Sequence, residues 1–95
     1  MDPEHFHDIL KLCEATPADS GGFREFPQKT TLSLYLAKNG VPLTVGNIEA
    51  VAVRGMHVHA RTTKGDLYVL SFEDLFAANI EGRMTPKAGR KAGFG

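Results

Sequence analysis

Residues 30–45 constrain the fold more than any other stretch, because they combine a strict alternation of side chains with a turn of defined geometry. Leucine occupies every second position from 32 to 36, which is the period of a strand with one buried face. Asn39-Gly40 follows, and this pair favours the two-residue hairpin turn in which both residues take positive φ. The stretch therefore predicts an antiparallel hairpin.

The turn also fixes the register of this hairpin. It sets two pairs of residues opposite each other, namely Leu36 with Leu43 and Leu34 with Val45. All four apolar side chains then share one face, so the turn and the alternation agree independently.

The chain is then expected to enter a central strand. Pro42 cannot donate a ladder hydrogen bond, which predicts a free sheet edge at that position, and Gly46 is expected to break or bend the strand. Residues 48–53 are apolar on both faces, which is typical of a covered, central strand. Arg54-Gly55 predicts a bulge or a tight turn.

Residues 56–71 predict a second hairpin with one apolar face. Met56, Val58 and Ala60 fall on that face, and the opposite face carries His57, His59 and Arg61. Lys64-Gly65 turns the chain into a strand at residues 67–71. A three-residue loop sets Ala60 opposite Leu70, whereas a two-residue loop sets His59 there. We prefer the first, because it pairs apolar residues.

Helices are predicted near both ends of the chain. Asp2 can cap a helix that has Pro3 at its first position, and the apolar stripe of that helix is Phe6, Ile9, Leu10 and Cys13. Thr16-Pro17 should end it. Residues 71–74 resemble a capping box, so a short second helix is expected, with Phe72, Leu75 and Phe76 as its apolar face and Asn79 at its end.

Two further segments connect or follow these elements. Residues 16–29 form a long connection that is either mobile or functional, and Phe23 and Phe26 are expected to pack on the edge of the core. The glycine-rich residues 82–95 predict a flexible basic tail. The predicted fold is therefore α+β: one domain at residues 1–81 with an N-terminal helix, a meander or half-barrel of four or five antiparallel strands, and a short C-terminal helix.

Composition excludes several classes of protein. Ninety-five residues make one domain, and no apolar run is long enough to cross a membrane. The acidic start lacks the features of a signal peptide, so a cytoplasmic location is expected. A single cysteine, Cys13, excludes an internal disulfide and a multi-cysteine zinc site. Residues 1–25 have a formal charge of −4 and residues 82–95 of +4, which could neutralise each other within a chain or between the copies of a homo-oligomer.

Catalytic and cofactor sites are not predicted. No nucleophile elbow or phosphate loop is present, so we expect no enzyme activity and no cofactor. His57 and His59 stand two residues apart on a strand and could chelate a metal, but their spacing is not that of a closed zinc site. We therefore interpret them as surface histidines.

Basic residues predict a nucleic-acid surface instead. One cluster lies on the second hairpin and its turn, and a second lies in the tail: Arg54, His57, His59, Arg61 and Lys64, then Arg83, Lys87, Arg90 and Lys91. Tyr35 and Tyr68 could stack on bases. Against this, the chain as a whole is neutral, whereas dedicated nucleic-acid-binding domains are usually basic.

Residues 48–76 resemble the first half of the LytTR-type DNA-binding domain of bacterial response regulators. The matching features are a strand opened by Ile48, Arg54-Gly55, Arg61-Thr62-Thr63, the Lys64-Gly65 turn, and a Tyr- and Leu-rich strand before Leu75. The later Arg-x-His-Arg-Ser motif of that family has no counterpart here. The resemblance implies DNA binding in transcription regulation, with His57, His59, Arg61 and Lys64 as contact residues.

The opening of the chain is also similar to the Sm-like RNA chaperone family of Hfq. The shared features are an N-terminal helix, residues 32–40 and an Ile-Glu strand, but the Tyr-Lys-His-Ala motif of that family is replaced here by residues 68–71. Both resemblances imply a small, twisted β-sheet.

Two functions follow from these observations. The first is a small regulatory domain that contacts nucleic acid through the His/Arg strand face and the basic tail. The alternative is a protein-interaction module, an adaptor or inhibitor, that uses a sheet edge, residues 16–29 and the C-terminal tail. Neither requires a membrane.

Overall fold

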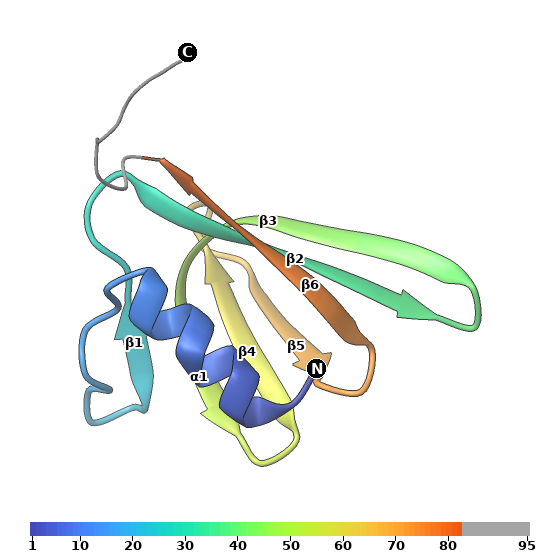
Figure 1. Ribbon diagram of the computed structural model, residues 1–95. Helices are drawn as coiled ribbons and strands as arrows, with labels where there is room; N and C mark the ends of the chain where they lie inside the picture. Colours follow the sequence, from blue (N-terminus) through green and yellow to red (C-terminus); the bar gives the residue numbers. More distant parts are fainter. Residues whose placement is uncertain (83–95) are drawn as a thin grey trace.

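The structure is a computed structural model that describes residues 1–82. The predicted tail beyond Gly82, with Arg83, Lys87, Arg90 and Lys91, therefore lies outside the described residues. One helix and six strands follow each other along the chain (Figure 1): α1 (Pro3–Leu12), β1 (Phe23–Glu25), β2 (Thr30–Lys38), β3 (Val41–Arg54), β4 (His57–Thr62), β5 (Leu67–Ser71) and β6 (Leu75–Gly82). This confirms the α+β class.

No helix among residues 1–82 has the length and apolar character needed to span a membrane.

The N-terminal helix begins as predicted and ends earlier. The Asp2 side chain accepts a hydrogen bond from the Glu4 amide at 3.4 Å, and Pro3 is the first helical residue. Cys13 caps the other end, and Glu14 follows with a φ of 59°. This left-handed residue ends the helix before Thr16-Pro17 is reached.

The hairpin of β2 and β3 has the predicted register. Leu36 lies opposite Leu43 and Leu34 opposite Val45. Positive φ values of 52° at Asn39 and 79° at Gly40 form the expected turn.

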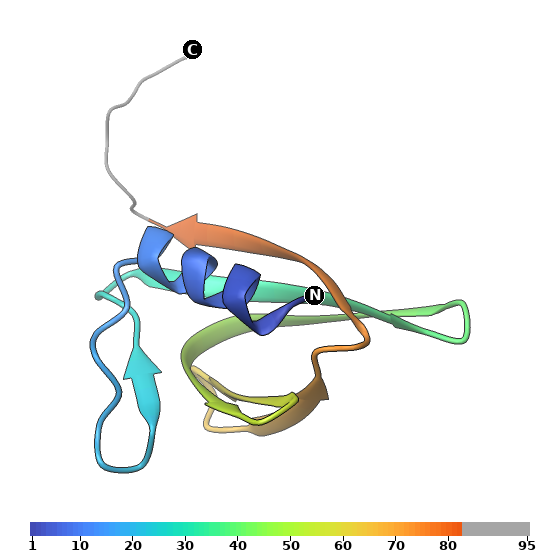
Figure 2. The ribbon, with the colours of Figure 1, turned by 60° about the horizontal axis from the view of Figure 1, so that its bottom comes forward.

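Strand β3 is longer than predicted, because the chain bends without breaking where the sequence suggested a break. Asn47 has a φ of 55°, and the strand continues from Val41 to Arg54. Residues 41–48 pair with β2, whereas residues 48–54 pair with β4 on one side, and residues 50–52 also pair with β1 on the other. The predicted strand at 48–53 is thus the central half of a longer strand that joins two layers of the structure (Figure 2).

The register between β4 and β5 differs from both predicted alternatives. Val58 lies opposite Leu70, and Ala60 lies opposite Tyr68. The loop has the preferred length of three residues but is centred on Lys64 instead of Gly65, because the Thr62 amide donates to the Asp66 carbonyl and the Thr62 hydroxyl accepts from the Asp66 amide. Val58 and Ala60 are buried as predicted, but Met56 lies in the preceding turn and is exposed.

The predicted C-terminal helix is wrong. Residues 72–74 form a turn, and residues 75–82 form strand β6, which pairs antiparallel with β2. Ser71 does cap locally, since its hydroxyl accepts from the Glu73 amide at 3.2 Å. The open edge of β2 supplies ladder hydrogen bonds that outweigh the helix propensity of Leu75-Phe76-Ala77-Ala78.

The six strands form one curled sheet in the order β5-β4-β3-β2-β6, with β1 paired to β3 beside this path. Helix α1 lies between β1 and β6 in both ribbon views (Figures 1 and 2). Phe6 and Leu10 of this helix are fully buried, and the Phe6 ring meets Phe72 edge-on at 5.4 Å between centroids. The helix therefore completes a core that the sheet alone leaves open.

Candidate interaction surface

The predicted strand face exists, because β4 alternates as the sequence indicated. Val58, Ala60 and Thr62 are buried, whereas the other residues of the strand face outward: His57, His59 and Arg61. His57 is exposed, and His59 and Arg61 are half-buried. The structure thus brings three of the predicted site residues together on one side of the sheet.

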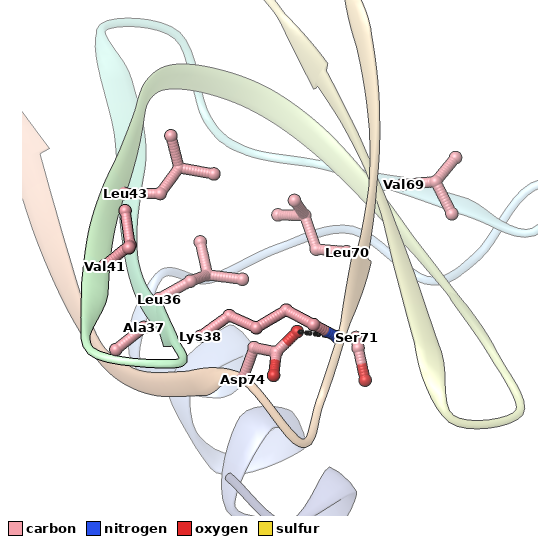
Figure 3. A pocket seen from close by; sticks show the side chains of 9 residues that line it. All are labelled: Leu36, Ala37, Lys38, Val41, Leu43, Val69, Leu70, Ser71 and Asp74. Atoms are coloured by element: carbon pink, nitrogen blue, oxygen red, sulfur yellow. Dashed lines mark ion pairs between the residues drawn. The ribbon is translucent and has the colours of Figure 1, made fainter.

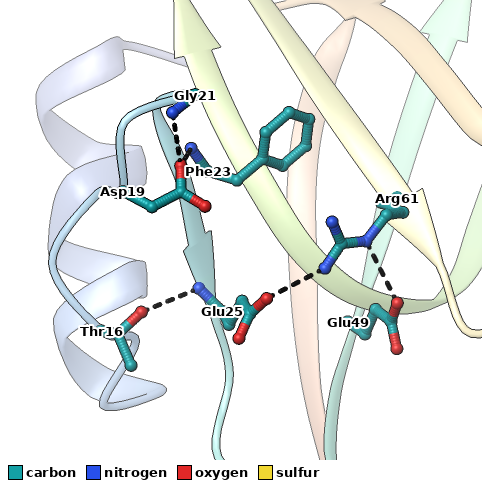
Figure 4. A network of polar contacts seen from close by, with 7 residues as sticks. All are labelled: Thr16, Asp19, Gly21, Phe23, Glu25, Glu49 and Arg61. Atoms are coloured by element: carbon teal, nitrogen blue, oxygen red, sulfur yellow. Dashed lines mark hydrogen bonds and ion pairs between the residues drawn. The ribbon is translucent and has the colours of Figure 1, made fainter.

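Arg61 is already engaged by other parts of the protein. Its guanidinium donates to Glu49 at 3.1 Å and to Glu25 at 3.2 Å, and it lies 5.5 Å from the centroid of the Phe23 ring (Figure 4). These contacts join β4 to β3 and to β1. Arg61 therefore has a structural role that neutralises its charge towards solvent.

Arg54 is engaged in a similar way. Its guanidinium donates to the Gly21 carbonyl and packs beside Gly22. The same loop is closed by the Asp19 carboxylate, which accepts from the amides of Gly21 at 2.8 Å and Phe23 at 3.0 Å (Figure 4).

The long connection at residues 16–29 is accordingly ordered. The Thr16 hydroxyl accepts from the Glu25 amide at 3.0 Å, and residues 23–25 form β1. Phe26 is buried in the core, which confirms the prediction for this residue, whereas Phe23 is half-buried beside the Arg61 guanidinium. Sequence reasoning missed β1 because three residues are too few to display a period.

Few basic side chains remain free for a nucleic acid within the described part of the chain. Residues 1–82 contain eleven acidic and seven basic residues, a formal charge of −4. Lys64 is exposed in the β4–β5 turn and has no ion pair among these residues. Within residues 1–82, no three His, Cys, Asp or Glu side chains gather in a geometry that could hold a metal ion.

An apolar groove lies under the end of the β2–β3 hairpin, which projects beyond the layer below it (Figures 2 and 3). The groove has a volume of about 220 Å³, and its apolar walls include Leu36, Val41, Leu43 and Leu70. Val41 is 66% exposed and Leu43 52% exposed, although both occupy the inward-facing register of the strand. The Lys38 ammonium lies 3.9 Å from the Asp74 carboxylate at its rim.

Strand β5 forms the other side of this groove and is an open edge of the sheet. It pairs only with β4 within the described residues. Its sequence, LYVLS, contains no charged residue, and its exposed side chains are Leu67, Tyr68 and Val69. Charged residues, prolines and bulges usually protect such edges from further pairing, and β5 has none of them within its five residues.

Strand β6, at the other end of the strand order, is an edge of a different kind. Strand β6 has a register shift opposite Tyr35/Leu36 and carries Glu81 and Asn79, whose side chains are hydrogen-bonded to each other at 3.1 Å. The uncharged run at residues 67–71 was the available sequence signal for β5, but only the fold reveals which strands lie at an edge.

No protein-family model matches the sequence, and no curated protein or solved structure is significantly similar to it. The function must therefore be argued from the geometry of this chain.

Proposed function

We propose that this protein is a protein-interaction module that binds an extended segment of a partner as an additional strand beside β5. The single observation that carries the proposal is the uncharged, unprotected edge of β5, with Leu67 and Val69 54% and 58% exposed. Strand addition supplies main-chain hydrogen bonds along such an edge, and alternate side chains of the added strand supply specificity.

The groove beside this edge supports the same function. A strand added to β5 would direct every second side chain towards the inner side of the sheet, where Leu70 faces Leu36 and Leu43 (Figure 3). Burial of one aliphatic side chain there would cover apolar surface that water now contacts. Each fully buried residue of that kind contributes about 1.5–3 kcal/mol.

Nucleic-acid binding, including the DNA-binding and transcription-regulation function that the LytTR resemblance implies, is less well supported by the described residues. Arg54 and Arg61 have protein partners, and the formal charge of residues 1–82 is −4. A phosphate backbone is attracted by free positive charge, and of the arginines and lysines predicted on the second hairpin only Lys64 has neither an ion pair nor a carbonyl partner among residues 1–82. Lys64, His57 and His59 remain the contact residues of that hypothesis, together with the four basic residues beyond Gly82.

A peptide-display selection on the immobilised full chain tests the proposal. We expect enriched peptides with alternating apolar residues, and we expect their affinity to fall at least tenfold for Val69→Lys. Asn79→Lys adds the same charge at an exposed site on the other edge strand and is the matched control. Peptides that bind both variants equally would contradict a role for β5.

Fluorescence anisotropy of the full chain with random duplex and single-stranded DNA and RNA tests the other hypothesis. Micromolar binding that weakens steeply with salt, and is lost in Lys64→Glu, would favour nucleic acid as the partner. The protein-interaction proposal expects no binding of this kind.

A further inference from the structure

We propose that the strand added to β5 is β5 of a second copy of this chain, in an antiparallel pair related by a two-fold axis at Val69. This inference rests on the proposed function, since it uses the same edge and names the partner. A two-fold interface requires a surface that is complementary to itself, and β5 meets that requirement in both side-chain pattern and charge.

The side chains of β5 are complementary to themselves in this register. A two-fold axis at Val69 sets Tyr68 of one copy opposite Leu70 of the other, and Leu67 opposite Ser71. Tyr68 and Leu70 share the inner side of the sheet, and Leu67 and Val69 share the outer side. Because no residue of the strand is charged, the pairing brings no like charges together.

The residues that flank β5 add charge complementarity. Lys64 and Asp66 precede the strand, whereas Glu73 and Asp74 follow it, and an axis at Val69 sets Lys64 opposite Asp74 and Asp66 opposite the uncharged Phe72. In the antiparallel pair, the beginning of one strand meets the end of the other, so Lys64 of each copy lies towards Glu73 and Asp74 of its counterpart. Lys64 and Glu73 are exposed, and neither forms an ion pair among residues 1–82. Two such opposite-charge contacts, one at each end, favour this orientation over a parallel one.

Strand β6, at the other end of the strand order, does not offer an equivalent surface. A two-fold pair of β6 strands would have to accommodate a register irregularity in each strand, together with an exposed Glu81 from each copy. Irregular and charged edges resist pairing, so β5 is better suited than β6 to a symmetric contact.

Sedimentation equilibrium of the full chain over micromolar concentrations tests the inference. We expect reversible self-association to a dimer, weakened at least tenfold by Val69→Lys and unaffected by Asn79→Lys. Lys64→Glu should also weaken it, and the double variant Lys64→Glu/Glu73→Lys should restore it, because the swap recreates the opposite-charge contacts. A chain that stays monomeric throughout, or a dimer that Val69→Lys leaves intact, would overturn the inference.

A symmetric crosslink distinguishes the two-fold pair from other assemblies. In Val69→Cys, the two introduced thiols would face each other across the axis within the Cα separation that a disulfide needs, so mild oxidation should give a covalent dimer. The native Cys13 is 1% exposed and is a suitable internal control. A monomeric chain whose β5 still binds selected peptides would overturn the second copy as the partner and leave the proposed function standing.

Discussion

The two halves of β3 belong to one strand and are both rich in apolar residues, yet they meet different surroundings. Residues 48–54 lie between β1 and β4, and Ile48, Ala50 and Val51 are fully buried. Residues 41–44 pair on one side only, and Val41 and Leu43 are mostly exposed. Alternation therefore indicates which face a side chain occupies, and it does not indicate whether another layer covers that face.

The largest expected effect is a loss of stability that differs between the two halves of β3. Ile48→Ala should lower the free energy of unfolding by about 2–5 kcal/mol, because it leaves a cavity in the closed core. Leu43→Ala should lower it by only about 1 kcal/mol, since half of that side chain already contacts water. Urea unfolding with unchanged m-values would measure both costs. Equal losses would show that the groove is closed in solution.

A smaller effect on the free energy of unfolding should appear at alkaline pH, because Cys13 is buried in the core that residues 48–54 help to form. Burial raises the pKa of the Cys13 thiol from 9.0 to about 11. Between pH 9 and 11 the thiol is ionised in the unfolded chain and protonated in the native one, so the unfolded chain binds fewer protons. The contribution of Cys13 to the free energy of unfolding is therefore fully present below pH 9. Above pH 9 it falls by up to about 1.4 kcal/mol per pH unit.

The matched control for this prediction is Cys13→Ala, which removes the thiol but keeps every lysine and tyrosine. The difference in unfolding free energy between the two proteins should therefore shrink from pH 9 to pH 11. A constant difference over that range would mean that the thiol ionises equally in both states.

The predictable parts of the fold are those that neighbouring residues determine. Asn39-Gly40 and the leucine alternation were sufficient for the register of β2 and β3, because turn and strand are adjacent in sequence. The β4–β5 register was missed because Thr62 pairs with Asp66, which moves the centre of the three-residue loop from Gly65 to Lys64. Strand β6 was missed because its conformation depends on the edge of β2, more than 35 residues earlier in the chain.

The candidate surface divides in the same way. The outward face of β4 was predicted from a period of two, but the engagement of Arg61 was not, because Glu25 comes from a strand of only three residues. The groove could not be predicted at all. It exists because the β2–β3 hairpin is longer than the layer beneath it, which is a property of the assembled sheet (Figure 2).

The smallest expected effects compare one ion-pair residue from each half of the molecule. Arg61→Gln should cost about 1 kcal/mol, because it removes two charge-assisted hydrogen bonds and leaves Glu25 and Glu49 without their cation. Lys38→Gln should cost less than about 0.5 kcal/mol, since Lys38 is 74% exposed and lies 3.9 Å from Asp74. Thermal unfolding at low salt would resolve the two variants.

Hydrogen exchange should report faster opening of β1 in Arg61→Gln alone, because only that variant loses a contact between β1 and β4. If Lys38→Gln were the more costly variant, the Lys38–Asp74 ion pair would stabilise the β2–β3 hairpin, which would contradict its placement at the rim of an open groove.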